Sequence, residues 1–193
     1  MIDPDKVTIF NRSKPELQEF LLFCVCAAGK NAKGAARGLQ RFLDRKSDIQ
    51  PFDKVRRFRS IPTLAKVLKK CGIGCYNNKA RTFCELACSK MDLRTCSVGR
   101  LEEIYGIGPK TARFYLMHSR RNQRLACLDT HVLRWLSDQG YEEIPKTTPT
   151  GSRYRKIESL FLSIADRHQV KPEYLDLEIW KAYSRKQPYV ING

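Results

Sequence analysis

The stretch Gly106-Ile107-Gly108 constrains this chain more than any other, because its two glycines separate two helical patterns. Glycine reaches positive φ and lets another backbone approach closely, as a tight hairpin requires. Pro109 suits the first position of the following helix, where its missing N–H costs nothing. The sequence therefore predicts helix, hairpin and helix over residues 101–118, with residues at helical spacing at Leu101, Ile104, Tyr105, Thr111, Ala112, Tyr115 and Leu116.

Lys110 stands in the first turn of the second predicted helix. This turn exposes unpaired N–H groups and the positive end of the helix dipole, which attract phosphate and repel a cation by about 0.3–1 kcal/mol. A purely structural role for Lys110 is therefore disfavoured. The same repulsion, with burial against a bound duplex, is expected to lower its pKa from about 10.4 and leave neutral amine able to attack carbon. Lys110 is thus a candidate nucleophile that forms a Schiff base.

Asp129 opens the next helical pattern, whose apolar positions include Val132, Leu133 and Leu136. An aspartate directly before such a pattern is a predicted N-cap. Considered separately, Asp129 could be only a cap, and Lys110 only one of the 36 Lys and Arg residues. Their occurrence together with the glycine hairpin is more specific than either alone.

These residues together resemble the motif of the helix-hairpin-helix (HhH-GPD) DNA glycosylases. That motif is a G-φ-G hairpin, a lysine two residues later and a D-x-H sequence beyond it, here Asp129-Thr130-His131. The resemblance implies an all-α fold of two helical lobes, with the active site in the cleft between them. It also implies that Lys110 is the nucleophile and that Asp129 stabilises the positive charge that develops on the sugar.

Longer segments resemble the small type-2 8-oxoguanine DNA glycosylases of this superfamily. These segments are Phe20–Lys33, Gly74–Arg81, Glu143–Thr147 and Tyr174–Trp180, and together with the hairpin and the D-x-H sequence they extend the resemblance over about two-thirds of the chain. By this resemblance, Trp180 stacks on the extruded base, and Cys75 occupies the position that covers the opposite face of the base. The alternative for Trp180 is a place in the hydrophobic core, because it stands on an apolar helix.

The end of the chain departs from that family. The family ends in a lysine that helps to read the oxidised guanine, whereas this chain continues over residues 185–193. Either Lys186 substitutes for that lysine in the base pocket, or the lesion is another oxidised or modified base.

Contacts to DNA are expected from the hairpin and from two further turns. The break at residues 29–34 is small, polar and basic, which suits a backbone close to DNA, although a plain interhelix turn fits equally well. Tyr76 follows a glycine-rich turn and either lies against the DNA or packs as an ordinary turn tyrosine. The predicted DNA-binding residues are Gly106, Ile107, Gly108, Thr111, Asn31, Lys33, Tyr76 and His131.

The net charge of +16 and pI near 9.7 suit a polyanion, so nucleic acid is the leading partner. The resemblance implies that this partner is double-stranded DNA containing a damaged base. The eight cysteines include no C-x-x-C pair, and none follows Cys127, where some glycosylases of the superfamily bind an iron–sulfur cluster. We therefore expect no metal site built from side chains and no iron–sulfur cluster. The resemblance allows a monovalent cation on the hairpin carbonyls.

The chain is expected to form one glycosylase unit over residues 1–193. One lobe, of about residues 30–120, carries the hairpin, and the second combines residues 15–29 with 125–193. Residues 1–14 have no clear period and predict a loose arm, and residues 47–60 predict an irregular connection.

No apolar run is long enough to span a membrane, and the first residues lack the pattern of a signal peptide. We expect an intracellular protein, in the cytoplasm, nucleoid or nucleus, that is not secreted, has no membrane contact and is a monomer.

The predicted function is that of a bifunctional DNA glycosylase and AP lyase, which extrudes and removes an oxidised purine, with 8-oxoguanine as the leading candidate. Among enzymes, the alternative is a glycosylase for oxidised pyrimidines or another modified base. The alternative of a different class is a non-enzymatic helix-hairpin-helix DNA-binding module. That module accounts for the glycines and the charge, but not for Lys110 and Asp129 together.

Overall fold

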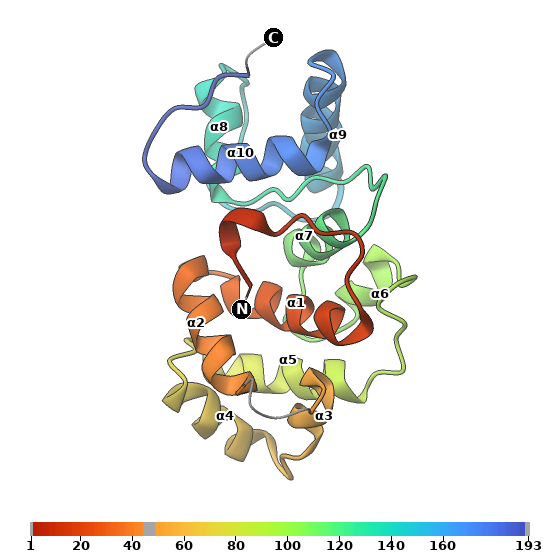
Figure 1. The fold of residues 1–193 in the computed structure, drawn as a ribbon. Helices are drawn as coiled ribbons and strands as arrows, with labels where there is room; N and C mark the ends of the chain where they lie inside the picture. Colours follow the sequence, from red (N-terminus) through yellow and green to blue (C-terminus); the bar gives the residue numbers. More distant parts are fainter. Residues whose placement is uncertain (1, 45–48, 192–193) are drawn as a thin grey trace.

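The computed structural model describes residues 2–44 and 49–191, and all regular elements in these ranges are helices (Figure 1). The all-α prediction is therefore confirmed. A short 3₁₀ helix, η1 (Pro4–Lys6), precedes the α-helices α1 (Lys14–Ala27), α2 (Ala32–Leu43), α3 (Pro51–Arg56), α4 (Ile61–Lys70), α5 (Tyr76–Cys88), α6 (Val98–Glu102), α7 (Pro109–Ser119), α8 (Thr130–Asp138), α9 (Gly151–Arg167) and α10 (Pro172–Ser184).

The helices bury two separate hydrophobic cores. The larger core contains side chains from α1 to α7, and the smaller core contains side chains from α8, α9 and α10. Figure 1 shows α8, α9 and α10 on one side of the molecule, α1 to α6 on the other, and α7 between them. We call the two groups the larger lobe and the smaller lobe.

The expected assignment of residues 15–29 to the second lobe is wrong, because α1 lies in the larger core. Its residues Phe20, Leu21, Leu22 and Phe23 are consecutive and fully buried, so this part of α1 is apolar around its whole circumference. A helix of this kind has to be surrounded by others. Accordingly, α1 contacts α2, α3, α5 and α7.

The last helix, α10, joins the two lobes through its two faces. Leu175, Ile179 and Tyr183 recur every four residues and belong to the smaller core. Leu177 belongs to the larger core, and Trp180 packs against it. The smaller lobe is therefore held against the larger lobe by a helix that contributes to both.

The N-terminal segment is not a loose arm. Val7 is buried, and the buried Arg12 guanidinium donates hydrogen bonds to the carbonyl oxygens of Val7 (2.7 Å), Ile9 (2.7 Å) and His118 (2.9 Å). It also lies 3.9 Å from the centre of the Phe20 ring. One buried cation thus fixes a segment that has no hydrophobic period of its own.

A short helix, α3, replaces part of the irregular connection expected at residues 47–60. Pro51 occupies its first turn, and Phe52 and Val55 are buried on one face. A helix this short offers only one apolar pair at helical spacing, which is too little periodicity to recognise in the sequence.

Candidate active site

The hairpin over residues 103–108 is anchored on α5. The Tyr105 N–H donates to Glu85 Oε2 (2.8 Å), and the Arg81 guanidinium lies 3.9 Å from the centre of the Tyr105 ring. The first helix of the motif, α6, ends at Glu102, so it is shorter than the predicted pattern, which ran to Tyr105. Tyr105 instead lies exposed in the turn, held by the polar groups of α5.

The two hairpin glycines differ in what they do. Gly106 has a φ of +78°, and a Cβ placed there would lie 2.6 Å from Thr82 Oγ1, so the fold requires glycine. Gly108 has a φ of −93°, and a Cβ there would meet nothing within 4 Å. Gly108 therefore keeps the backbone bare at the start of α7 rather than relieving a packing conflict.

Two predicted DNA contacts next to these glycines have buried side chains. Ile107 is 3% exposed and packs into the larger core, and Thr111 is 6% exposed. Only their backbone groups are left to face a duplex. The side chain of Ile107 instead anchors the tip of the hairpin in the larger lobe.

Lys110 is the second residue of α7 and is half-buried. Among residues 2–44 and 49–191, its ammonium has no hydrogen-bond or ion-pair partner. Groups from three other segments act on its charge: Cys24 from α1, Cys127 and Asp129 from the connection before α8, and Asp176 from α10. An unpaired ammonium beside two carboxylates is a reactive arrangement rather than a packing contact.

The pKa of Lys110 is shifted in the direction opposite to that expected from the sequence. Burial lowers this pKa, but Cys127, Asp129, Asp176 and Cys24 together raise it by more, so the net shift is upward. The helix-dipole argument did not include the acidic groups that the fold brings to Lys110, and its second condition, burial against a bound duplex, is not met in the free protein. The amine is therefore protonated in the free protein at neutral pH.

Asp129 is the N-cap of α8, as predicted. Its Oδ1 accepts hydrogen bonds from the N–H groups of His131 (2.8 Å) and Val132 (3.0 Å). Among the described residues, Oδ2 has no hydrogen-bond partner. One oxygen thus fixes the orientation of the carboxylate, and the other is left to act on a neighbouring group.

A buried polar chain that the sequence did not reveal lies next to Lys110. His118, on α7, is fully buried, with Nε2 3.0 Å from Asp176 Oδ2 and Nδ1 2.7 Å from Thr8 Oγ1. Burial raises the pKa of Asp176, and Asp129 raises it further, while His118 opposes the shift. The only sequence signal was an aspartate between two leucines on an apolar helix.

The other predicted DNA contacts lie on the surface of the larger lobe or at the start of α8. Asn31 caps α2 by accepting from the Gly34 N–H (2.9 Å), and the exposed Lys33 lies 3.9 Å from Asp5. Tyr76 is half-buried against the larger core, with the Lys69 ammonium 5.4 Å from its ring centre. His131 is half-buried in the first turn of α8.

The predicted base-pocket residues are not brought into one contact. Trp180 lies half-buried on α10, one turn after Asp176, and packs against the larger core. Cys75 is exposed at the N-cap of α5 with a φ of +54°, where residues 75–78 line an open hollow. Lys186 is exposed beyond α10, in a tail where Tyr189 O accepts from Trp135 Nε1 (3.1 Å) in the smaller lobe. Their roles toward a base stay predictions.

Within the described part of the chain, no group of three or more His, Cys, Asp or Glu side chains is arranged to hold a metal ion. All eight cysteines are free thiols. None of the helices in the described ranges combines the length and the apolar character that a membrane crossing needs.

The sequence is similar to known proteins over most of its length. Residues 6–170 match the profile of the family described as 8-oxoguanine DNA glycosylase. An 8-oxoguanine DNA glycosylase/AP lyase of Metallosphaera sedula is 31% identical over 172 residues, which cover 83% of this chain and 78% of that protein. One of Methanocaldococcus jannaschii is 29% identical over 182 residues, covering 88% and 81%.

Two solved structures share the fold. The crystal structure of the Methanocaldococcus jannaschii 8-oxoguanine DNA glycosylase has a TM-score of 0.72 at 24% identity and covers 95% of this chain and 86% of that one. That of the Thermotoga maritima 8-oxoguanine DNA glycosylase has a TM-score of 0.74 at 24% identity and covers 98% and 89%.

Proposed function

Since this chain belongs to the 8-oxoguanine DNA glycosylase family, we propose that it is a bifunctional glycosylase and AP lyase that excises 8-oxoguanine from double-stranded DNA. One observation carries the proposal. The half-buried ammonium of Lys110 has no partner among the described residues and lies under the influence of Asp129, whose Oδ2 is equally unpartnered there. This is the pair of groups that amine attack at a sugar carbon needs.

The first step is substitution at the sugar. The target nucleotide leaves the base stack, because its glycosidic carbon cannot be reached inside a duplex. The Lys110 ammonium loses a proton to water, and the amine then bonds to C1′ as the C1′–N9 bond breaks. The base leaves with that electron pair and takes up a proton. Before the new bond is complete, the Asp129 carboxylate stabilises the positive charge on the sugar.

The second step cleaves the strand. Opening of the sugar ring converts the bond between Lys110 and C1′ into an imine. The imine makes the C2′ proton acidic, so that proton leaves and the C3′–O3′ bond breaks with departure of the 3′ phosphate. Water then hydrolyses the imine and returns free Lys110.

The hairpin is the proposed phosphate contact. A Cβ at Gly108 would meet nothing within 4 Å, so the backbone at the start of α7 is open on that side, and the chain carries a net charge of +16. A monovalent cation on the hairpin carbonyls remains a prediction from the resemblance. DNA as the substrate also supports an intracellular site of action.

A panel of duplexes, each with one lesion, tests this function. We expect the protein to excise 8-oxoguanine and cut the strand, and to act more slowly on an oxidised pyrimidine and not on undamaged DNA. Faster excision of the oxidised pyrimidine would assign the enzyme to the alternative substrate. Equal binding to all duplexes without cleavage would identify a non-enzymatic DNA-binding module.

A further inference from the structure

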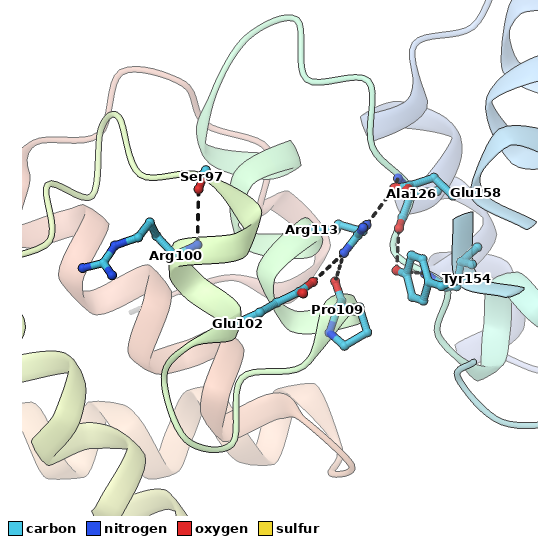
Figure 2. A network of polar contacts seen from close by, with 9 residues as sticks. Ser97, Arg100, Glu102, Pro109, Arg113, Ala126, Tyr154 and Glu158 are labelled. Atoms are coloured by element: carbon cyan, nitrogen blue, oxygen red, sulfur yellow. Dashed lines mark hydrogen bonds and ion pairs between the residues drawn. The ribbon is translucent and has the colours of Figure 1, made fainter. Parts of the chain in front are cut away.

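Arg113 lies one turn after Lys110 on α7 and reaches from the larger lobe to the smaller lobe (Figure 2). Its Nη1 donates to Glu102 Oε1 (2.8 Å) and to the Pro109 carbonyl (3.2 Å), and its Nε donates to Glu158 Oε1 (2.9 Å). The side chain is only 12% exposed. One guanidinium therefore ties the end of α6, the first turn of α7 and the middle of α9 together.

On α9, Glu158 and Tyr154 bind the segment that leads to Asp129. Glu158 Oε1 accepts from the Ala126 N–H (3.0 Å), and the Tyr154 hydroxyl donates to the Ala126 carbonyl (2.7 Å). The same hydroxyl accepts from the Leu128 N–H (3.1 Å). Figure 2 shows that Arg113, Glu158 and Tyr154 meet beside Ala126, and Arg113 lies 4.4 Å from the centre of the Tyr154 ring.

This arrangement leaves little freedom to the residues directly before Asp129. Both backbone groups of Ala126 are bonded to α9, and the Leu128 carbonyl accepts from Thr148 Oγ1 (2.8 Å). Asp129 therefore follows a segment that is fixed to α9, and α9 is fixed through Arg113 to α7, whose second residue is Lys110. Arg113 pairs with acidic partners on both lobes through Nε and Nη1, so these two donor groups are committed to protein rather than to phosphate.

We propose that Arg113, with Glu158 and Tyr154, is a positioning unit that sets the Asp129 carboxylate relative to the Lys110 amine. The inference rests on the proposed function, because it assigns these residues a part in the same reaction. A buried ion pair is a weak source of stability, so its value here is geometric. A shift of about 1 Å between reacting groups lowers a rate by about 10²-fold.

The main test compares two substrates of the variant Arg113→Lys, which keeps the charge but lacks the planar fork that bonds both lobes. Excision of 8-oxoguanine needs Asp129 beside the sugar cation, whereas Schiff-base formation on a preformed abasic site starts from an aldehyde and needs Lys110 alone. We expect single-turnover excision to fall about 10- to 100-fold and cleavage of the abasic duplex to fall much less. Affinity for undamaged duplex should stay within about twofold, because phosphate contacts are retained.

Tyr154→Phe provides a second variant that keeps the ring in place and removes only the hydroxyl that holds Ala126 and Leu128. It should show the same split between excision and abasic-site cleavage, to a smaller degree. Arg124→Lys is the matched control, since Arg124 also pairs with a carboxylate of α9, Asp166 (2.7 Å), but is exposed and has no polar partner in the described part of the larger lobe. It should leave both rates unchanged.

The Asp129→Asn background completes the test. If Arg113 acts through Asp129, Arg113→Lys should lower excision little further in that background. An equal loss in both backgrounds, or an equal loss of excision and abasic-site cleavage, would overturn the positioning role. Excision at the wild-type rate by both Arg113→Lys and Tyr154→Phe would also overturn it. These outcomes are distinct from failure of the proposed function, in which the wild-type protein itself shows no excision.

Discussion

The two sides of the site are held by different forces. On the side of Lys110, the hairpin is fixed by close packing: Gly106 touches Thr82, and Ile107 inserts into the larger core. On the side of Asp129, the chain is fixed by hydrogen bonds, from the cap on Oδ1 and from the contacts of α9 with Ala126 and Leu128. The nucleophile is thus placed by shape and the carboxylate by polar contacts.

This difference predicts which substitutions lower the stability of the protein and which lower the reaction rate. Packing around a glycine tolerates almost no change in shape, so substitutions on the Lys110 side should act on stability first. A charged side chain that makes a polar contact can be replaced by an isosteric neutral one, which keeps the structure and removes only the charge. Substitutions on the Asp129 side should therefore act on the rate.

The largest effect should come from Asp129→Asn. Asparagine is as good an N-cap as aspartate, so α8 and the melting temperature should be preserved. The neutral amide cannot stabilise the sugar cation, so single-turnover excision should fall by about 10²-fold or more, while affinity for the duplex stays the same. Unchanged turnover would reduce Asp129 to a helix cap.

The next prediction is that substitutions of the two hairpin glycines affect different properties, stability at Gly106 and duplex binding at Gly108. Gly106→Ala places a Cβ 2.6 Å from Thr82 Oγ1 at a φ of +78° and should cost about 1–3 kcal/mol of unfolding free energy. Gly108→Ala should leave stability unchanged, because its Cβ meets nothing within 4 Å, but should weaken binding to any duplex by obstructing the backbone. Chemical denaturation and duplex titration of both variants check this, and a stable Gly106→Ala protein would contradict it.

Trp180 lies between the two sides, on the helix that joins the lobes. Trp180→Ala should weaken binding to the lesion duplex by about 1–3 kcal/mol if the indole stacks on the extruded base, and leave undamaged-duplex binding nearly unchanged. A tryptophan that serves only the core behaves differently. Its loss would lower the melting temperature and affect both duplexes equally, and that result would remove Trp180 from the base pocket.

The smallest effect concerns Glu85, which accepts a hydrogen bond from the backbone of the hairpin. The hydrogen bond from the Tyr105 N–H and the ion pair with Arg81 lower the pKa of Glu85, although burial opposes the shift. A lowered folded-state pKa adds stability above the unfolded pKa, near 4.3, and that stability is lost as the pH falls through the folded pKa. Glu85→Gln should therefore cost less than about 1 kcal/mol at pH 7, because the side chain is 35% exposed.

The pH dependence distinguishes this contribution from general packing. The stability difference between wild type and Glu85→Gln should shrink as the pH falls below about 4, where the wild-type carboxyl becomes neutral as well. Denaturant titrations at pH 7 and pH 3.5 measure it. A difference that is constant with pH would mean that the charge of Glu85 does not hold the hairpin.

The sequence was sufficient to predict those structural elements that are determined by neighbouring residues. The glycine hairpin, the proline at the start of α7 and the cap at Asp129 each follow from neighbouring residues, and apolar spacing predicts α7 and α8 as well, with exceptions elsewhere in the chain. The exceptions, α3 and the end of α6, are short elements whose boundaries depend on tertiary contacts.

The polar contacts around the site could not be predicted, because the residues that form each contact are far apart in the sequence. His118 meets Thr8 and Asp176 across 110 and 58 residues, and Arg113 meets Glu158 across 45. No local pattern marks such pairs. The upward pKa shift of Lys110 in the free protein was not predicted for the same reason, since Asp176 reaches Lys110 only through the fold.

The central claim is that Lys110 is the nucleophile, and borohydride trapping on an 8-oxoguanine duplex tests it most directly. Reduction of the imine should join the wild-type protein covalently to DNA, and Lys110→Gln should give no adduct. Lys156→Gln, which replaces an exposed lysine of α9, is the matched control and should be trapped like wild type. An adduct of wild-type yield from Lys110→Gln would show that another amine carries the reaction.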